Sequence, residues 1–371
     1  MQKKFSLKNE QDIEDLLKGC AFYGTGGGGE ISAGRTSLLD CLSQNLNLTL
    51  LDPDDIKADA LYCCPFFMGS IAPKTAEILA EMEALGYLDR KYFLEEILIG
   101  AVRTLEEVTG KTVEGLYIAE PGGSNAGCCM AAAYKMDIPV IDGDPAGRAI
   151  PEMTQGLPAI RGMNFLPAAY FDAWGNKNVT LQTMNTKVAE RIGKFLSEAA
   201  YGEMAEAAYL MTGKELKTIL VPRTLSKAYQ VGRAMSGAED VLTAASEAAG
   251  GKVVGRGVIQ KLEARDQGGY YWGTYEVQGD DDRLYKIWFK NENHILWIDG
   301  RPAVTSPDLI SLIDLEEKEP LLNSHLENGR HVGIVVSPAY DFYHEEKSIE
   351  SFGPRYFGFD FDYIPFTGAK L

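Results

Sequence analysis

The pattern of apolar and polar positions changes character along the chain. Between residues 48 and 144, short apolar runs alternate with segments in which apolar residues recur at helical spacing. Strands are predicted at 48–52, 60–67, 113–120 and 138–144, and helices at 75–87, 94–110 and 125–136. This alternation is typical of a mostly parallel sheet that is covered by helices.

Helical patterns also occur on both sides of this region. Residues 9–19 predict a short helix that begins after the cap residue Asn9 and ends at Gly19. A second helix is predicted within 31–47, directly after a run of glycines. Further along the chain, helices are predicted at 185–220 and 225–235.

After about residue 240, apolar and polar residues alternate and turn sequences such as GDDD and DGRP separate the runs, which predicts antiparallel strands. We therefore predict an α/β N-terminal domain with a mostly parallel sheet over 1–170. A helical connection and a β-rich C-terminal domain are expected over 171–371. The aromatic and acidic segment 351–366 is expected to be an extended arm that packs on the body.

The charge balance limits the classes of partner. The chain has 36 basic and 53 acidic residues and a net charge of −17, so a nucleic acid or an anionic membrane would be repelled. No run of 18 apolar residues occurs, and the polar N-terminal segment does not resemble a signal peptide. We expect a cytoplasmic protein that binds a small molecule and, like many large α/β enzymes, forms a homo-oligomer.

The cysteines and histidines carry no metal signature. All six cysteines lie within the first 130 residues, without a CxxC pair, and the four histidines are distant from them in sequence. Reduced, buried thiols in a cytoplasmic protein are the simplest interpretation. We expect no cofactor, although a carboxylate cluster can hold a divalent metal without a readable spacing, and that alternative stays open.

A run of glycines, GTGGGG, precedes the helix predicted within 31–47. Such a run lets backbone N–H groups approach a ligand closely, and the dipole of the following helix favours negative charge there. The alternative is a tight turn that is needed only for packing. We predict a ligand-contacting loop formed by Thr25, Gly26, Gly27, Gly28 and Gly29.

Acidic residues gather where two predicted strands end. Glu120 follows one strand, and Asp142 and Asp144 follow the next. Because ligands bind at the carboxyl ends of strands in an open parallel sheet, these three side chains are the candidate catalytic acids and bases. They could instead bind a metal or only cap helices.

Three neighbouring polar residues are candidates for substrate binding. Asn125 follows Glu120 in the turn PGGSNAG, and Arg148 and Glu152 follow the aspartates in PAGRAIPE. Arg148 could bind a substrate carboxylate or hold a neighbouring aspartate ionised. The alternative is that it only neutralises nearby acids.

Four motifs, GTGGGG, EPGGSNA, DGDPAGRAIPEM and GPRYFGFDFDYIPF, occur in this order along nearly the whole chain. Together they resemble the DUF917 family, which is described as the S-methyl thiohydantoin desulfurase family. The resemblance implies an N-terminal α/β domain, a β-containing C-terminal domain and an active site near their junction. It also implies hydrolysis of an S-methylated thiohydantoin with release of methanethiol, or action on a related cyclic ureide, in a setting of hydantoin utilisation.

This chemistry requires a nucleophile and a group that stabilises developing charge. Glu120, Asp142 or Asp144 could activate water, and backbone amides of the glycine run or Asn125 could stabilise the charge. A cysteine nucleophile is a second route, with Cys63, Cys64, Cys128 and Cys129 as its candidates. Two other classes stay open: an isomerase, racemase or lyase on a hydantoin-like ring, and a non-catalytic metabolite-binding partner of a hydantoinase.

Overall fold

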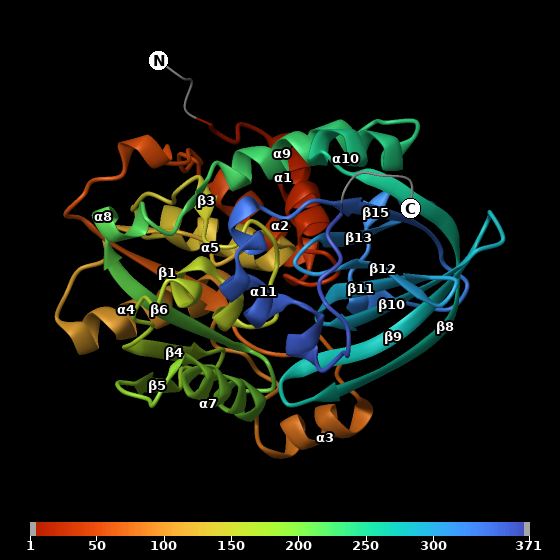
Figure 1. Cartoon of the computed structure of the whole chain (residues 1–371). Helices are drawn as coiled ribbons and strands as arrows, with labels where there is room; N and C mark the ends of the chain where they lie inside the picture. Colours follow the sequence, from red (N-terminus) through yellow and green to blue (C-terminus); the bar gives the residue numbers. More distant parts are fainter. Residues whose placement is uncertain (1–4, 367–371) are drawn as a thin grey trace.

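The computed structural model describes residues 5–366. Its first sheet has the strand order β2-β1-β6-β4-β5 and lies beside a larger sheet, as Figure 1 shows. Its strands are β1 (Leu61–Phe67), β2 (Gly115–Leu116), β4 (Ala168–Asp172), β5 (Lys177–Thr180) and β6 (Met204–Thr212). Because β2 joins β1 through a helical crossover the two are parallel, whereas β6, β4 and β5 add in antiparallel orientation.

The predicted parallel arrangement therefore holds for the first part of a mixed sheet. Single parallel bridges join Val140 to Leu116 and Leu51 to Ile141, so the predicted strand 138–144 lies beside β2, and the predicted strand 48–52 lies beside 138–144. These contacts are isolated bridges and not continuous ladders. The segment 138–144 ends in β3 (Gly143–Asp144), which pairs with β7 (Val221–Pro222). The α/β class of this half is confirmed.

The prediction of continuous helix over 185–220 is wrong in its second half. Helix α7 (Thr186–Ala199) forms as expected, but the chain then turns at Gly202, which has a φ of 79°. It continues as β6 between β1 and β4, followed by the short helix α8 (Gly213–Leu216). Because both sides of β6 are covered, its alanine-rich run is buried like a helix face, and periodicity alone does not separate the two.

Helix α1 (Glu10–Tyr23) begins at Asn9, whose side chain accepts a hydrogen bond from the amide of Asp12, as predicted. The helix does not end at Gly19, however. A Cβ at this position would lie 1.7 Å from the carbonyl oxygen of Ala228 in α9 (Thr224–Met235). Gly19 is therefore a contact point between two crossing helices, and not a stop signal.

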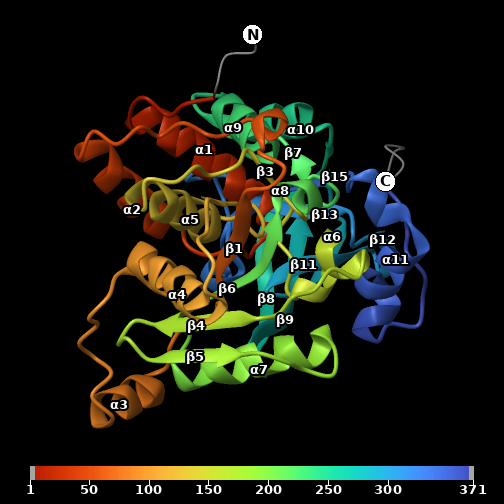
Figure 2. The same cartoon turned by 90° about the vertical axis from the view of Figure 1, so that its left-hand side faces the viewer.

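Further helices of this half are α2 (Ile31–Ser43), α3 (Ala76–Ala84), α4 (Leu94–Thr109), α5 (Gly123–Lys135) and α6 (Leu157–Ile160). Of these, α4 and α5 pack on the first sheet, and α3 stands away from it (Figure 2). Short 3-10 helices are η1 (Pro53–Asp55), η2 (Met153–Gln155), η3 (Asn323–His325), η4 (Asp341–His344) and η5 (Pro354–Phe357). Helix α4 packs on β4, β6 and β1, and α5 packs between α2 and α4.

The C-terminal half contains an eight-stranded sheet with the order β12-β11-β10-β9-β8-β15-β13-β14, and every pairing is antiparallel. The β-rich prediction is confirmed. The strands are β8 (Lys252–Gln267), β9 (Tyr270–Gly279), β10 (Leu284–Lys290), β11 (Glu292–Ile298), β12 (Arg301–Thr305), β13 (Leu309–Asp314), β14 (Glu319–Pro320) and β15 (His331–Ser337). Helix α10 (Val241–Ala249) packs on β8 and β15.

The last segment packs on this sheet. Helix α11 (Glu346–Phe352) precedes η5, and an extended arm follows. The amide of Ile364 donates to Thr305 Oγ1 and the Tyr363 hydroxyl donates to Asp308 Oδ2, so the arm is held along β12 and the turn after it. Between residues 5 and 366, no helix is long and apolar enough to cross a membrane.

The crossing of α1 and α9 generates a stability prediction. A Cβ at Gly232 of α9 would lie 1.7 Å from the carbonyl oxygen of Asp15 in α1. Although alanine is favoured over glycine in a helix by about 1 kcal/mol, we expect Gly232→Ala to destabilise the protein by about 2 kcal/mol, because backbone must shift. Chemical denaturation measures this change.

The control for this prediction is Gln230→Ala on the exposed face of the same helix. Its free energy of unfolding should change by less than about 0.5 kcal/mol. A Gly232→Ala protein as stable as wild type would show that the two helices are not in close backbone contact.

Candidate active site

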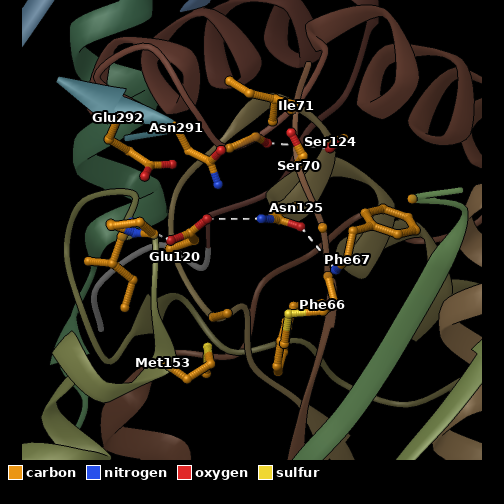
Figure 3. Close-up of a pocket in the computed structure, with 18 of the residues that line it drawn as sticks. Phe66, Phe67, Ser70, Ile71, Glu120, Ser124, Asn125, Met153, Asn291 and Glu292 are labelled. Carbon is orange, nitrogen blue, oxygen red and sulfur yellow. Dashed lines mark hydrogen bonds between the residues drawn. The ribbon is translucent and has the colours of Figure 1, made fainter. Parts of the chain in front are cut away.

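A cavity of about 140 Å³ lies where the two halves of the molecule meet. Several segments contribute to its wall: Gly28 and Gly29 of the glycine run, residues 66–71 at the end of β1, residues 119–125, the segment with Ile150, Pro151 and Met153, helix α7, Gly202, and the start of β11. Figure 3 shows Glu120 and Asn125 from one half beside Asn291 and Glu292 from the other. The glycine run and the turn around Glu120, which the sequence predicted to be part of one site, are thus brought together.

Glu120 is the predicted acid that lines this cavity. Its Oε1 accepts a hydrogen bond of 2.9 Å from Asn125 Nδ2, and its Oε2 accepts one of 2.5 Å from the amide of Ile150. Burial raises the pKa of Glu120 to about 8, although these two donors favour its ionised form. A carboxyl group with this pKa can exchange a proton near neutral pH.

Glu292, at the start of β11, is a second buried acid in the cavity wall. Its Oε2 has no hydrogen-bond partner among the described residues. Burial and, to a smaller extent, the proximity of Glu120 raise its pKa well above the ordinary value. Fewer donors stabilise its anion than stabilise that of Glu120, which favours the protonated form of Glu292.

Sequence reasoning did not identify Glu292. A signal was present, because residues 290–294 read KNENH inside a strand pattern, and all five are buried. A strand with one face on a core and one on solvent would alternate apolar and polar residues. Five consecutive polar residues in a strand pattern therefore indicate that this end of the strand packs against polar groups from another part of the molecule.

Asn125, near the N-terminus of α5, positions Glu120 against the end of β1. Its Nδ2 donates to Glu120 and its Oδ1 accepts a hydrogen bond of 3.2 Å from the amide of Phe67. The side chain therefore fixes the distance between two segments of the cavity wall. Figure 3 shows both bonds.

The glycine run is required by packing on both halves. A Cβ at Gly26 would lie 2.4 Å from the Asn323 side chain, and one at Gly27 would lie 1.9 Å from Glu292 Oε1. Gly28 and Gly29 have φ values of 76° and 77°, and both line the cavity. Both interpretations of the sequence therefore apply to this run. Gly26 and Gly27 are needed for packing, and Gly28 and Gly29 present backbone that a ligand in the cavity can approach.

Thr25 and Arg148 lie outside the cavity wall and form a buried clasp. The Arg148 guanidinium donates to Thr25 Oγ1 at 3.1 Å and to the carbonyl oxygens of Pro307 and Asp308 at 2.7 and 3.1 Å. Its Nε donates to the carbonyl oxygen of Ala149. With its donors directed at the protein itself, Arg148 holds the glycine run, its own loop and the turn before β13 together.

Asp142 and Asp144 also lie outside the cavity wall. Asp142 accepts hydrogen bonds from the amide and the hydroxyl of Ser226 and thereby caps the start of α9. Asp144 Oδ1 accepts hydrogen bonds from the amides of Ala146 and Gly147, which closes the turn before Arg148. Burial raises the pKa of Asp144 to about 6 and that of Asp142 above its ordinary value.

Glu152 belongs to a buried ion pair behind the cavity wall. It pairs with Lys290, and its Oε2 accepts a hydrogen bond of 2.5 Å from the Tyr356 hydroxyl. Burial alone would raise the pKa of Glu152, but Lys290 and Tyr356 together hold it below the ordinary value.

Helix α7 supplies Glu190 and Lys194 to the cavity wall. The Lys194 ammonium lies 3.8 Å from Glu190 Oε1 and 4.3 Å from the centroid of the Tyr270 ring. Burial raises the pKa of Glu190, and Lys194 opposes that shift. Neither residue carried a sequence signal beyond its place in an amphipathic helix.

All six cysteines are buried thiols, and none of them lines the cavity. Burial raises the pKa of each thiol, so the thiolate that a nucleophilic mechanism needs is disfavoured. Within residues 5–366, no group of three or more His, Cys, Asp or Glu side chains is arranged to hold a metal ion.

The fold and the cavity define a two-part protein, α/β and antiparallel β, with an acid-lined site at the junction of its halves. Family models agree: residues 11–182 match the "S-Me-THD-like, N-terminal domain" and residues 184–366 the "S-Me-THD-like, C-terminal domain". The chain therefore belongs to the S-Me-THD-like family, the S-methyl thiohydantoin desulfurase family that its motifs resemble. Strand β6 falls within the second match but completes the first sheet.

A solved structure shares this fold. It is a crystal structure of a protein from Chromobacterium violaceum, with 23% sequence identity and a TM-score of 0.74, and the similarity covers 97% of this chain and 99% of that one. None of the curated proteins matches the chain.

The clasp generates a second stability prediction. Arg148→Met would leave several buried carbonyl oxygens without donors, so we expect a loss of about 3–5 kcal/mol in the free energy of unfolding. Arg161, whose exposed guanidinium pairs with Glu345, is the matched control. Arg161→Met should cost less than about 1 kcal/mol, and equal losses for the two variants would contradict the clasp.

Proposed function

We propose that the chain is a hydrolase that acts on an S-methyl thiohydantoin or a related cyclic ureide. In this reaction, water attacks the ring carbon that bears the sulfur, and methanethiol is released. The proposal is carried by one observation: Glu120 and Glu292, two buried carboxyl groups from different halves of the molecule, line one small cavity. Family membership supports the choice of substrate class.

The surroundings of the two acids suggest which is the base. Glu120 accepts two hydrogen bonds that stabilise its anion, whereas Glu292 Oε2 accepts none from the described residues. Two acids whose environments separate their pKa values in this way can act as a base and an acid in one site. Glu120 is therefore assigned as the general base and Glu292 as the general acid.

The proton transfers balance over two steps. In the first, the water oxygen bonds to the ring carbon, Glu120 takes a water proton, and the ring nitrogen takes the proton of Glu292. In the second, the carbon–sulfur bond breaks, the departing thiolate takes the proton from Glu120, and the new hydroxyl returns its proton to Glu292. The products are methanethiol and a ring carbonyl beside an N–H group, and both carboxyl groups are restored.

Replacement of the base tests the assignment. We expect Glu120→Gln to lower the rate of methanethiol release at least 100-fold, because general acid–base catalysis contributes about 10²–10⁴. A thiol-reactive dye measures the product. Glu198→Gln, an exposed change on α7, is the control and should keep wild-type turnover. If folded Glu120→Gln and Glu292→Gln proteins both turned over like wild type, the mechanism would be wrong.

The raised pKa of Glu120 predicts a pH dependence. Because the base acts only when it is ionised, kcat/KM should rise as pH increases through about 8, and it should fall again where Glu292 loses the proton that the acid must supply. The measurement is a pH profile from 6 to about 9.5 with buffers of constant ionic strength. A rate that falls throughout this interval would assign the protonated form of Glu120 to the reaction instead.

A further inference from the structure

We infer that Lys194 is a ligand-contacting residue whose ammonium pairs with an anionic oxygen or sulfur of the molecule bound in the cavity. The inference rests on the proposed function only for the identity of that molecule. It adds a residue that neither the sequence pattern nor the acid–base assignment includes.

The Lys194 side chain is buried, and within residues 5–366 its ammonium has an ion-pair partner but no hydrogen bond. The side chain is only 9% exposed, and among the described residues its nitrogen donates no hydrogen bond. Glu190 is 3.8 Å away, which is too long for a hydrogen bond. An ammonium has three donors, and Glu190 at this distance occupies none of them, so the donors are available to a molecule in the cavity that Lys194 lines.

Lys290 provides an internal comparison. Its ammonium lies over the same Tyr270 ring, at 3.9 Å from the centroid, and is equally buried. Lys290 is paired with Glu152, however, and does not line the cavity. Two lysine ammonium groups thus lie over one aromatic ring, and the one that faces the cavity has, among the described residues, an ion-pair partner but no hydrogen bond.

The position of Lys194 is fixed by its surroundings. A Cβ at Gly269, in the turn between β8 and β9, would lie 2.9 Å from Lys194 Cδ, so this turn packs on the alkyl chain. The Tyr270 ring supports the ammonium through a cation–π contact. A side chain held in this way loses little conformational entropy when it binds a ligand.

A second cavity lies directly beside the one that Lys194 lines. It has a volume of about 480 Å³, shares Ser70 and Gly202 with the first and includes Gly269 in its wall. Among the described residues of the smaller cavity's wall, Lys194 is the one cationic side chain, beside three glutamates. In a protein with a net charge of −17, a local cation of this kind is needed to attract an anion.

The first experiment uses acetate and its uncharged isostere acetamide as probes, at constant ionic strength. We expect acetate to raise the melting temperature of the wild-type protein by at least 2 °C and acetamide to leave it unchanged. Lys194→Met should abolish the acetate shift, while Lys187→Met, an exposed lysine of the same helix, should keep it. Equal shifts with acetate and acetamide, or an acetate shift that survives Lys194→Met, would overturn the inference.

This first experiment does not depend on turnover, so its failure is distinct from failure of the proposed function. If Lys194→Met does not fold, equal shifts of the wild-type protein with acetate and acetamide would still overturn the inference.

The second experiment identifies the source of the negative charge. If the ligand carries a carboxylate substituent, Lys194→Met should raise KM about 10- to 100-fold for the carboxylate substrate and leave its carboxamide analogue unchanged. If the charge develops on the departing sulfur, kcat should fall about 10-fold or more for both substrates. Either result supports the inference, and changes below about 3-fold in all constants contradict it.

Discussion

The site depends on one steric constraint, the close passage of the glycine run between the two halves of the molecule. A Cβ at Gly26 or Gly27 would collide with side chains of the C-terminal half, and one at Gly28 would lie 2.6 Å from Gly122 Cα at the start of α5. Backbone this close to both neighbours sets the width of the junction. Arg148 then fixes the loop through hydrogen bonds to Thr25 and to the turn before β13.

Burial at this junction determines the chemistry of the charged groups. Glu120, Glu292 and Lys194 come from three separate parts of the chain, line one cavity and are each buried. In such surroundings, small differences in hydrogen bonding separate the proton affinities of two otherwise identical carboxyl groups. The strongly acidic outer surface has no direct part in this, because its charges are screened by solvent.

The contacts behind the cavity wall explain why several conspicuous charges lie away from the site. Asp142 caps α9, Asp144 closes a turn, and Glu152 pairs with Lys290. Each satisfies backbone or side-chain groups that would otherwise be buried without a partner, which is costly. Charged residues near strand ends are therefore ambiguous in sequence, because helix caps, turns and catalytic groups use the same residue types.

The sequence by itself determined that the chain has an α/β half and an antiparallel β half. It also predicted that Glu120 and the glycine run lie at one site, and both line the cavity. These predictions succeed because periodicity and turn chemistry are local properties. The sequence did not determine that 204–212 is a strand, that α1 continues through Gly19, or that Glu292 and Lys194 face the cavity with Glu120. Those features depend on which segments meet across more than a hundred residues. Only the tertiary structure brings such segments together, and burial then decides which polar side chains are paired and which remain available to a ligand.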